Sequence, residues 1–588
     1  MKKNIIVLGG GYAGLEAAKA LHKHLRNDSA IAITMIDTNE YHTLLTELHE
    51  IAGNRVENSG VKVSIHHVLE YTKVNFIQDR IIKADLAEKK LYSANQEYSF
   101  DYLVLAVGSE PAYFGIDGMQ QHGFCLWTFD DAVRIRKHII SMFEMASKEK
   151  NPDIRKELLT FVIGGGGFTG IEMVGELIQW TRYMAHDYEI KKNEVQLVVV
   201  EALPKILPVL KDKLIQKAER FLIKNSVQIK TMSPITQVTP DKVIISSGEE
   251  ILTRTLIWTG GIQTKEFVRN LGITLGKRNR IVVNEYLQTK EFSYVYAVGD
   301  DMEHTDKEGK VLPPLVETAL QSAKAAANNI VALLRGKNQQ PLQAKLHGVM
   351  ISIGSVYAVA DVMGMSMSSL FATAMKHLVN IHYLFSLGGL ELIMAYINHQ
   401  FLHKVRKGNW VLDQGLNHVK VKTFTFWLTI IRIWLGITWV AEGINKINQG
   451  WFQYVKLGPA DATSSASITS LISSHTPSWY GWIVETIIYP NSLIFQKMIV
   501  VTEIGLGLAF ITGTLTVIAA LVAIALNVNF MLSTGLPIVQ STKLPDLWYL
   551  IASASMLGGG GRAFGLDHYI MPFLRNKVRW FQRNVGKS

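Results

Sequence analysis

The pattern G-x-G-x-x-G occurs twice in this chain, each time between an apolar run and a helix-forming stretch. The first copy follows residues 4–8 (NIIVL), and the second follows residues 159–163 (LTFVI). A buried strand, a glycine loop and a helix N-terminus form a cradle for a pyrophosphate, because the glycines let phosphate oxygens approach the backbone. Two such units predict an α/β chain with tandem Rossmann domains and two dinucleotide sites. The glycines are Gly9, Gly11 and Gly14 in the first copy and Gly165, Gly167 and Gly170 in the second.

Each copy is followed by a second strand that ends in a carboxylate. Residues 31–36 lead to Asp37, and residues 195–200 lead to Glu201. A carboxylate there accepts hydrogen bonds from ribose hydroxyls and disfavours a 2′-phosphate, so we expect NADH rather than NADPH at the second site. The second strand begins late, which predicts an insertion around Arg182–Asn193. The alternative for either copy is a strand–helix unit that only packs against its neighbours.

Three further apolar strands, at residues 101–109, 255–261 and 294–300, end in small residues of the kind that border a cofactor at the carboxyl edge of a sheet. Cys125 is the single cysteine. The chain therefore has no second thiol for a dithiol–disulfide mechanism or a cysteine-ligated cluster, and we expect no metal site. We interpret Cys125 as a small apolar residue.

The composition changes beyond about residue 345. Residues 370–403 are apolar enough to lie on a bilayer but too interrupted for a confident span. Four strongly apolar segments follow, which predict an all-α, four-helix transmembrane bundle. They run from Phe424 to Ile444, Leu493 to Thr512, Leu515 to Thr534 and Leu544 to Leu557.

The net charge of +10 reflects basic residues that flank the apolar segments. Residues 404–407, Lys420 and Lys422 precede the first segment, and residues 575–583 follow the last, whereas residues 448–490 carry few lysines or arginines. The positive-inside rule then places the N-terminal part and the C-terminus in the cytoplasm of a multi-pass cell-membrane protein. With no nucleic-acid motif, the charge indicates a membrane surface rather than nucleic acid.

Three charged residues interrupt the apolar segments: Arg432, Glu442 and Glu503. A charge in such a helix is costly, so two interpretations stay open. One is a salt bridge inside the bundle, and the other is a site for a polar headgroup, a proton or a quinone.

Together these motifs resemble the type II NADH:quinone oxidoreductases, which are single-subunit membrane flavoproteins. The matching stretches are residues 7–14, 41–48, 162–172 and 295–300. The resemblance implies non-covalent FAD in the first site, NADH in the second and a membrane quinone as acceptor. Carried over, it assigns Gly9, Gly11, Gly14, Asp37, Gly108, Gly299 and Asp300 to FAD, and Gly165, Gly167, Gly170, Glu201 and Gly260 to NADH.

The resemblance also implies three catalytic residues. Glu172 would lie beside the nicotinamide and flavin, where it orients the carboxamide or relays a proton; the alternative is a glutamate that favours the helix dipole. The family's quinone signature, Pro-Pro followed by Ala-Gln-x-Ala-x-x-Gln, appears here with Val316 and Glu317 in place of the first pair, while Gln321 remains. Glu317 either adds a protonatable group near the quinone, signals a changed acceptor or is a plain helix N-terminal acid.

The C-terminal part resembles DoxX-like four-helix membrane domains. The matching features are Arg432 with Gly436, Glu442-Gly443, Glu503 with Gly505, Gly513, and Gly561-Arg562 with Gly565-Leu-Asp567. We expect an FAD domain (1–120 and 275–345), an inserted NADH domain (121–274), a membrane-associating amphipathic segment (346–420) and the DoxX-like domain (421–588).

The expected activity is oxidation of cytoplasmic NADH with two-electron reduction of a menaquinone-type quinone. We expect no proton pumping, a homodimer, and electrons that feed respiratory or extracellular electron transfer. The alternative is a membrane redox sensor or partner-docking protein whose bundle has a separate role.

Overall fold

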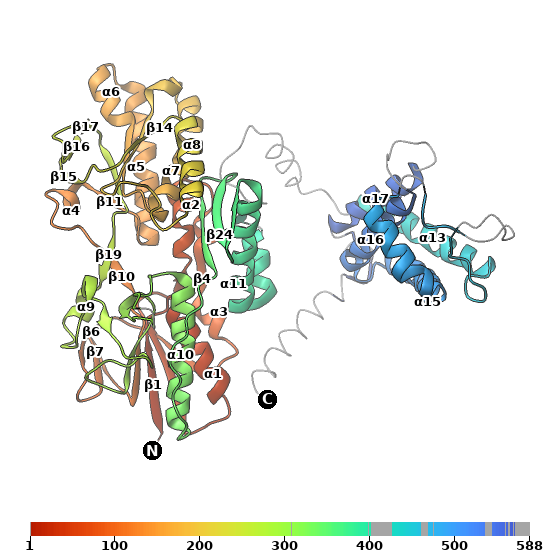
Figure 1. Cartoon of the computed structure of the whole chain (residues 1–588), viewed down its shortest axis with the longest axis horizontal. Coiled ribbons are helices and arrows are strands. Elements are labelled where there is room, and N and C mark those ends of the chain that lie inside the picture. The colour runs from red at the N-terminus through yellow and green to blue at the C-terminus, as the bar shows by residue number, and fades with distance from the viewer. Residues whose placement is uncertain are drawn as a thin grey trace. The chain divides into compact units, whose positions relative to one another are not determined.

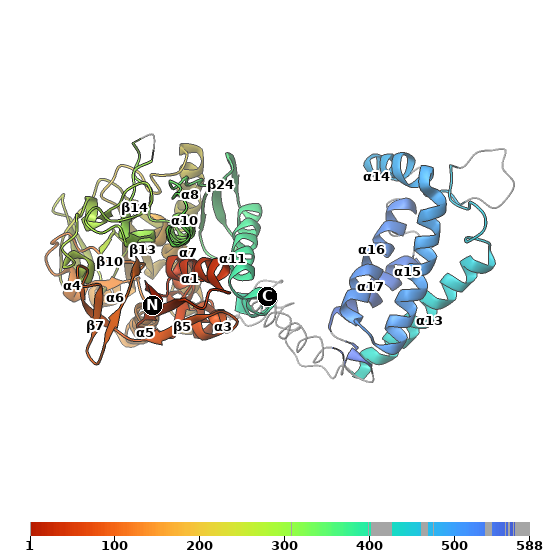
Figure 2. The ribbon, with the colours of Figure 1, turned by 90° about the horizontal axis from the view of Figure 1, so that it is seen from below.

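The computed structural model divides the chain into two compact units, Met1–Lys420 and Val421–Val585, which we describe separately. Figures 1 and 2 show the ribbon from two sides. The structure describes residues 2–306, 309–397, 399–400, 426–459, 469–473, 476–534, 544–558, 560–561, 565–567 and 570. The basic residues expected around the apolar segments, at 404–407, 420, 422 and 575–583, and Arg562 lie outside these ranges.

Two five-stranded parallel sheets form the centre of the first unit, which confirms the tandem Rossmann prediction. In each sheet, the strand before the glycine loop is central and pairs with the acid-bearing strand on one side. The first sheet has the order β21 (Val295–Ala297), β9 (Tyr102–Leu105), β1 (Lys3–Leu8), β2 (Ile31–Asp37) and β5 (Val74–Gln78). The second has the order β11 (Phe124–Cys125), β18 (Thr255–Trp258), β12 (Thr160–Gly164), β13 (Gln196–Val200) and β14 (Val227–Lys230).

The central strands are continuous apolar runs because helices cover both faces of their sheets. Residues 5–8 of β1 and all of β12 are buried. Helix α1 (Tyr12–Leu25) packs against α10 (Val316–Leu334) beside the first sheet. Helix α7 (Phe168–Asp187) packs against the second sheet.

The predicted insertion at Arg182–Asn193 is wrong over most of its length. Helix α7 continues through Asp187, and a short 3₁₀ turn at Lys192–Glu194 leads into β13. Trp180, Met184 and Ala185 are buried in this last part of the helix. The late start of the second strand thus reflects a longer helix, stabilised by its buried face.

Smaller elements complete the first unit. Helices α2 (Leu48–Ala52), α3 (Ile65–Leu69), α4 (Met119–His122), α5 (Phe129–Lys148), α6 (Pro152–Leu159), α8 (Asp212–Lys224) and α9 (Glu266–Arg269) connect or cover the sheets. The additional strand groups are β3 (Tyr41–Thr43) with β4 (Lys62–Ser64); β6 (Ile81–Asp85), β7 (Lys90–Ser93) and β8 (Glu97–Ser99); β10 (Ser109–Pro111) with β19 (Ile262–Thr264); β15 (Ile235–Val238), β16 (Lys242–Ile245) and β17 (Glu250–Leu252); and β20 (Ile281–Val282) with β22 (Met302–Glu303).

A third sheet and a long helix follow α10. The sheet is antiparallel, with β23 (Gly348–Ser352), β24 (Ala358–Val362) and β25 (Met365–Ser368). Helix α11 (Leu370–Ile397) lies alongside β24, as Figure 1 shows, and its regular conformation is broken at Gly388 and Gly389. One side of α11 is buried, while Leu370, Phe371, Leu378, Phe385, Leu390 and Met394 are exposed.

The second unit is built from apolar helices, as predicted. They are α13 (Phe426–Asn448), α14 (Ser478–Ile483), which a π-helical turn and a 3₁₀ turn join to α15 (Ser492–Thr512), α16 (Thr516–Thr534) and α17 (Leu544–Ser555). Figure 2 shows these helices side by side. Helices α13 and α15 approach most closely at glycines: a Cβ on Gly507 would lie 2.8 Å from the carbonyl oxygen of Gly436. Small residues are the usual means by which membrane helices pack together.

Three helices in the described part of the chain are long and apolar enough to cross a membrane: Leu370–Ile397, Ser478–Thr512 and Thr516–Ser533. The last two contain the predicted segments at 493–512 and 515–534. The first is the stretch that we expected to be too interrupted to span. Leu547–Gly558 is a shorter apolar helix, and α13 carries Arg432 and Glu442 and does not meet the same criterion.

Candidate active site

The first glycine loop has the geometry that a pyrophosphate cradle requires. Gly9 has a φ of 113°, and a Cβ on Gly14 would lie 1.8 Å from the Gly9 carbonyl oxygen, so helix α1 can pack this closely on the loop only with glycine. Gly11 precedes α1 without a side-chain cap, and open space surrounds its Cα. The amide groups at this helix N-terminus are therefore available to an anion.

The second loop repeats this arrangement. Gly165 also has a φ of 113°, and a Cβ on Gly170 would lie 1.9 Å from the Gly165 carbonyl oxygen. Gly167 precedes α7 without a side-chain cap and faces open space. The two loops are thus built alike, from chain segments more than 150 residues apart.

Both predicted ribose-binding acids are held at the edge of their loops. Asp37 accepts hydrogen bonds from the Gly10 amide at 2.6 Å and the Asn39 amide at 2.7 Å. Glu201 accepts hydrogen bonds from the Gly166 amide at 2.6 Å and the Leu203 amide at 2.7 Å.

These residues fit a dinucleotide in each unit: uncapped helix N-termini, cradles that only glycine leaves open, and oriented carboxylates. The first unit suits FAD and the second suits NADH.

The other predicted FAD residues lie at the ends of β9 and β21. Gly108 donates from its amide to Asp301 at 2.9 Å, and Ser109 donates from its hydroxyl to Asp300 at 2.6 Å. Gly299 donates from its amide to the Ser322 hydroxyl on α10, which joins this strand end to that helix. Burial raises the pKa of Asp300, and it raises the pKa of Asp301 to about 7. Asp301 is a buried member of this group that sequence analysis missed.

Gly260, predicted to contact NADH, lies beside the second loop. A Cβ on Gly165 would lie 3.0 Å from the Gly260 Cα, and a Cβ on Gly260 would overlap the Trp258 ring. Cys125 is buried near Trp258, and burial raises the pKa of its thiol to about 12. The thiol therefore stays protonated, as expected of a small apolar residue.

Glu172 lies on α7 and faces β23 and α2. Its carboxyl is 3.4 Å from the Ser352 hydroxyl and 3.7 Å from the His49 Nδ1. Burial raises the pKa of Glu172 to about 7, so its carboxyl can hold or release a proton at neutral pH. His49 is buried near Lys376, and both effects lower the pKa of His49 well below its ordinary value.

Next to Glu172 is a buried ionic cluster that sequence analysis missed. Lys376 on α11 lies 3.2 Å from a carboxylate oxygen of both Glu47 and Glu50 and 3.3 Å from the Ser352 hydroxyl. Arg55 pairs with Glu50 and, at 3.0 Å, with Glu176 on α7. We call Glu47, Glu50, Arg55, Glu172, Glu176 and Lys376 the acidic cluster.

The acidic cluster contains four carboxyl groups and two cations, so full ionisation would leave two uncompensated charges in the interior. Burial opposes this, and together with the neighbouring Glu50 it raises the pKa of Glu47 to about 8. Burial alone would also raise the pKa of Glu50, but Arg55 and Lys376 hold that pKa well below its ordinary value. The cluster therefore stores protons near neutral pH, chiefly on Glu47 and Glu172.

Glu317 and Gln321 both bind the segment that precedes β23. The Glu317 carboxylate accepts a hydrogen bond from the His347 amide at 2.9 Å and pairs with the His347 ring. Gln321 donates to the Lys345 carbonyl at 2.7 Å and accepts from the Lys345 amide at 2.9 Å. The two residues stand one helical turn apart on α10, apart from the acidic cluster in these contacts.

An aromatic group joins α11 to the first glycine loop. The Tyr383 hydroxyl lies 3.0 Å from the His42 Nε2, and the Tyr12 ring packs against both side chains. Burial lowers the pKa of His42 to about 4, so the imidazole is neutral. Helix α11 thus contributes to both the acidic cluster and the start of α1.

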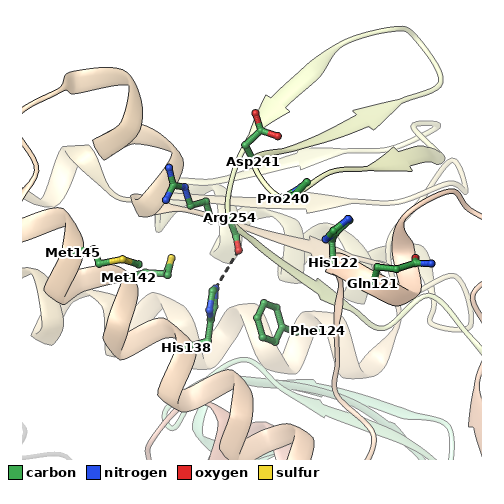
Figure 3. Close-up of a pocket in the computed structure, with 9 residues that line it drawn as sticks. All are labelled: Gln121, His122, Phe124, His138, Met142, Met145, Pro240, Asp241 and Arg254. Atoms are coloured by element: carbon green, nitrogen blue, oxygen red, sulfur yellow. Dashed lines mark hydrogen bonds between the residues drawn. The ribbon is translucent and has the colours of Figure 1, made fainter.

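A pocket of about 480 Å³ lies elsewhere in the NADH-domain region and is shown in Figure 3. His138 lies in its wall and is hydrogen-bonded to the Arg254 carbonyl and the Thr255 hydroxyl. Burial lowers the pKa of His138 to about 4. The pocket contains none of the predicted site residues. Its lining residues are Gln121, His122, Phe124, His138, Met142, Met145, Pro240, Asp241 and Arg254.

Comparisons with known proteins agree with this geometry. Residues 3–323 match the family of pyridine nucleotide-disulphide oxidoreductases, and residues 427–584 match the family described as TQO small subunit DoxD. The type II NADH:quinone oxidoreductase of Staphylococcus aureus (strain NCTC 8325 / PS 47) is 31% identical over 399 residues, which are 66% of this chain and 97% of that protein. The enzyme of the same name from Staphylococcus epidermidis is 30% identical over 397 residues, with the same coverage.

Two solved structures share the fold of the first unit. NDH2 from Plasmodium falciparum in complex with NADH has a TM-score of 0.62 and 18% identity, over 68% of this chain and 98% of that one. The sulfide:quinone oxidoreductase from Aquifex aeolicus has a TM-score of 0.55 and 17% identity, over 72% of this chain and 96% of that one.

Proposed function

The chain belongs to the type II NADH:quinone oxidoreductases, within the pyridine nucleotide-disulphide oxidoreductase family, and from this membership we propose that it uses FAD to reduce a menaquinone-type membrane quinone with NADH. The balanced reaction is NADH + H⁺ + quinone → NAD⁺ + quinol, which moves two electrons. The observation that carries the proposal is the pair of matched glycine cradles, each bordered by a fixed carboxylate.

We assign the first cradle to FAD and the second to NADH. The N-termini of α1 and α7 would face the two pyrophosphates, and Asp37 and Glu201 would accept hydrogen bonds from ribose hydroxyls. FAD, when bound, takes two electrons from NADH and passes them on to the quinone. Asp300, at the end of β21, would hold the ribityl chain.

Protons for the quinol come from the acidic cluster in this proposal. Glu172 is its member closest to the second loop along the chain, and its carboxyl exchanges a proton near pH 7. Lys376 stands between Glu47, Glu50 and Ser352, so a proton lost from Glu172 can be replaced within one connected group. Glu317 would serve as a second proton-carrying group on the acceptor side.

Helix α11 supports a membrane acceptor. Its buried side supplies Lys376 to the acidic cluster, while Phe371, Leu378 and Leu390 on the other side are at least 59% exposed. An exposed apolar face of this kind favours contact with lipid. We place α11 against the bilayer, where a lipid-soluble quinone would arrive next to the proton-storing residues.

The remaining features of the proposal rest on charge distribution and family resemblance. The first unit would face the cytoplasm of a cell-membrane protein, the enzyme would not pump protons, and it would act as a homodimer. The electrons would feed respiratory or extracellular electron transfer.

The test uses the full chain in lipid nanodiscs. Flavin content is read from absorbance, and NADH oxidation is followed with menadione, with ubiquinone-1 and without a quinone. The proposal expects one FAD per chain and quinone-dependent NADH oxidation that is faster with menadione. Flavin reduction by NADH without any quinone turnover would instead support a redox sensor or partner-docking protein.

A further inference from the structure

The second unit contains charged side chains that neither packing nor the first unit's chemistry explains. Lys446 on α13 donates to Glu503 on α15 at 2.6 Å. Glu503 is 1% exposed, and its other carboxylate oxygen is buried with no hydrogen-bond partner among the residues that the structure describes. A buried carboxylate left half satisfied in an apolar bundle is costly, which favours a functional role.

Glu442 adds a second carboxyl group to the same region. It stands one helical turn before Lys446, on the stripe of α13 that also carries the buried residues Leu435 and Trp439. Glu442 is nevertheless exposed, and it lies within electrostatic range of Glu503. Two carboxyl groups therefore face one ammonium, and in an apolar bundle the excess carboxyl retains its proton and becomes a hydrogen-bond donor.

Aromatic rings border the Lys446 ammonium on two sides. Its Nζ lies 5.7 Å from the centre of the Trp451 ring and 6.0 Å from the centre of the Phe530 ring on α16. The ammonium has three N–H donors, and Glu503 is its hydrogen-bond partner within the described residues. Donors remain available between two flat apolar surfaces.

Gln496 holds the turn that carries Trp451 in place. Its amide donates to the carbonyls of Trp451 and Tyr454 and accepts from the Lys456 amide at 2.9 Å. Gln496 is fully buried on α15, two turns before Glu503. All of these groups therefore belong to one constructed site at the C-terminal end of α13.

We propose that Lys446, Glu503 and Glu442, with Trp451 and Phe530, bind the headgroup of a quinone or quinol inside the second unit. The ammonium would donate to one ring oxygen and a protonated carboxyl to another, while the aromatic side chains contact the faces of the ring. This proposal rests on the proposed function only in that the enzyme's quinone shares the same bilayer. It adds a second quinone site, apart from the flavin, at the end of α13 next to the segment predicted to lie outside the cell.

The site can be tested by photolabelling the full FAD-loaded chain in nanodiscs with an azido-naphthoquinone, in the dark phase without NADH. Peptide mapping should find label between residues 446 and 457 or near Phe530, and excess menadione should compete with it. Lys446→Met should lower this labelling at least tenfold, because a charge-assisted hydrogen bond is lost. The matched control, Lys497→Met, removes a lysine from α15 that has no contact with Glu503 and should label like the parent.

Phe530→Leu provides a second variant that leaves the Lys446–Glu503 pair intact, in case Lys446→Met does not fold. It should also reduce labelling of the second unit. Label confined to residues 1–400, or bundle labelling that menadione does not compete or that both variants retain, would overturn the site. NADH-dependent menadione turnover is measured on the same samples: intact turnover with no bundle label contradicts this site alone, and bundle label without turnover contradicts the proposed function alone.

Discussion

Asp37 and Glu201 occupy equivalent positions in two structurally repeated units, each accepting a 2.6 Å hydrogen bond from the middle glycine amide of its loop. The repeat extends to the next hydrogen bond, from the amide two residues further on, at 2.7 Å in both. One chain thus carries two copies of the same nucleotide-recognition geometry, and the two acids separate the roles of the two copies experimentally.

The first prediction concerns nucleotide choice. Glu201→Gln should raise the KM for NADH about tenfold and improve the ratio of NADPH to NADH activity, because a neutral side chain no longer repels a 2′-phosphate. Steady-state kinetics with both nucleotides measure this. The matched variant Asp37→Asn should instead lower flavin content. If Glu201→Gln lost flavin and kept its NADH kinetics, the assignment of the two cradles would be reversed.

The second prediction concerns Glu172 and pH. Burial raises its pKa to about 7, so the protonated form that can donate to a quinone declines as pH rises through 7. Quinone-dependent kcat should fall on the alkaline side of an inflection near pH 7, and Glu172→Gln should remove that inflection and lower kcat at least tenfold. A pH–rate profile of both proteins from pH 5.5 to 9 decides. An inflection that persists in Glu172→Gln would assign it to another group.

The same shift predicts a change in stability. A carboxyl whose folded pKa is raised from 4.5 to about 7 stabilises the fold below pH 4.5 relative to higher pH, and this contribution is lost as pH rises through 7. Above pH 8, Glu172→Gln should therefore be more stable than the parent, by up to about 3 kcal/mol. Thermal unfolding at pH 6 and pH 8.5 measures the difference. A variant that is less stable at pH 8.5 would show that the carboxylate has stronger partners than His49 and Ser352.

Much of the nucleotide-binding half follows from the sequence, because its signals are local. The glycines, the strands before them and the acids after them lie within about 40 residues of one another in each copy. The acidic cluster was not predictable in this way, since Glu50 and Lys376 are 326 residues apart and meet only when α11 packs on the first unit. The supposed insertion before β13 failed for another reason: polar residues near its start obscured a helix whose opposite face is buried.

The third prediction tests the acidic cluster as a structural unit. Arg55→Met removes the partner of both Glu50 and Glu176 and should destabilise the protein by about 3–5 kcal/mol, because buried carboxylates are left unpaired. Chemical denaturation of the first unit's signal, such as flavin fluorescence, measures this. Arg134→Met breaks an exposed pair with Asp131 and should change stability by less than about 1 kcal/mol. Equal effects of the two substitutions would contradict the cluster's role.

The fourth prediction concerns the position where this chain departs from the family pattern. Glu317→Gln should still accept the hydrogen bond from the His347 amide, so the fold is retained. The neutral amide cannot carry a proton, and we expect quinone-dependent kcat to fall about tenfold while single-turnover flavin reduction by NADH stays unchanged. Stopped-flow absorbance separates the two steps. Unchanged turnover would leave Glu317 as a clamp on the segment before β23.

The central claim is that this chain passes electrons from NADH through FAD to a membrane quinone. Its most direct test is anaerobic stopped-flow absorbance of the FAD-loaded full chain in nanodiscs, first mixed with NADH and then with menadione. The account predicts that flavin absorbance is bleached by NADH and returns when menadione is added, with one quinol formed per NADH oxidised. Bleached flavin that menadione does not reoxidise would contradict it.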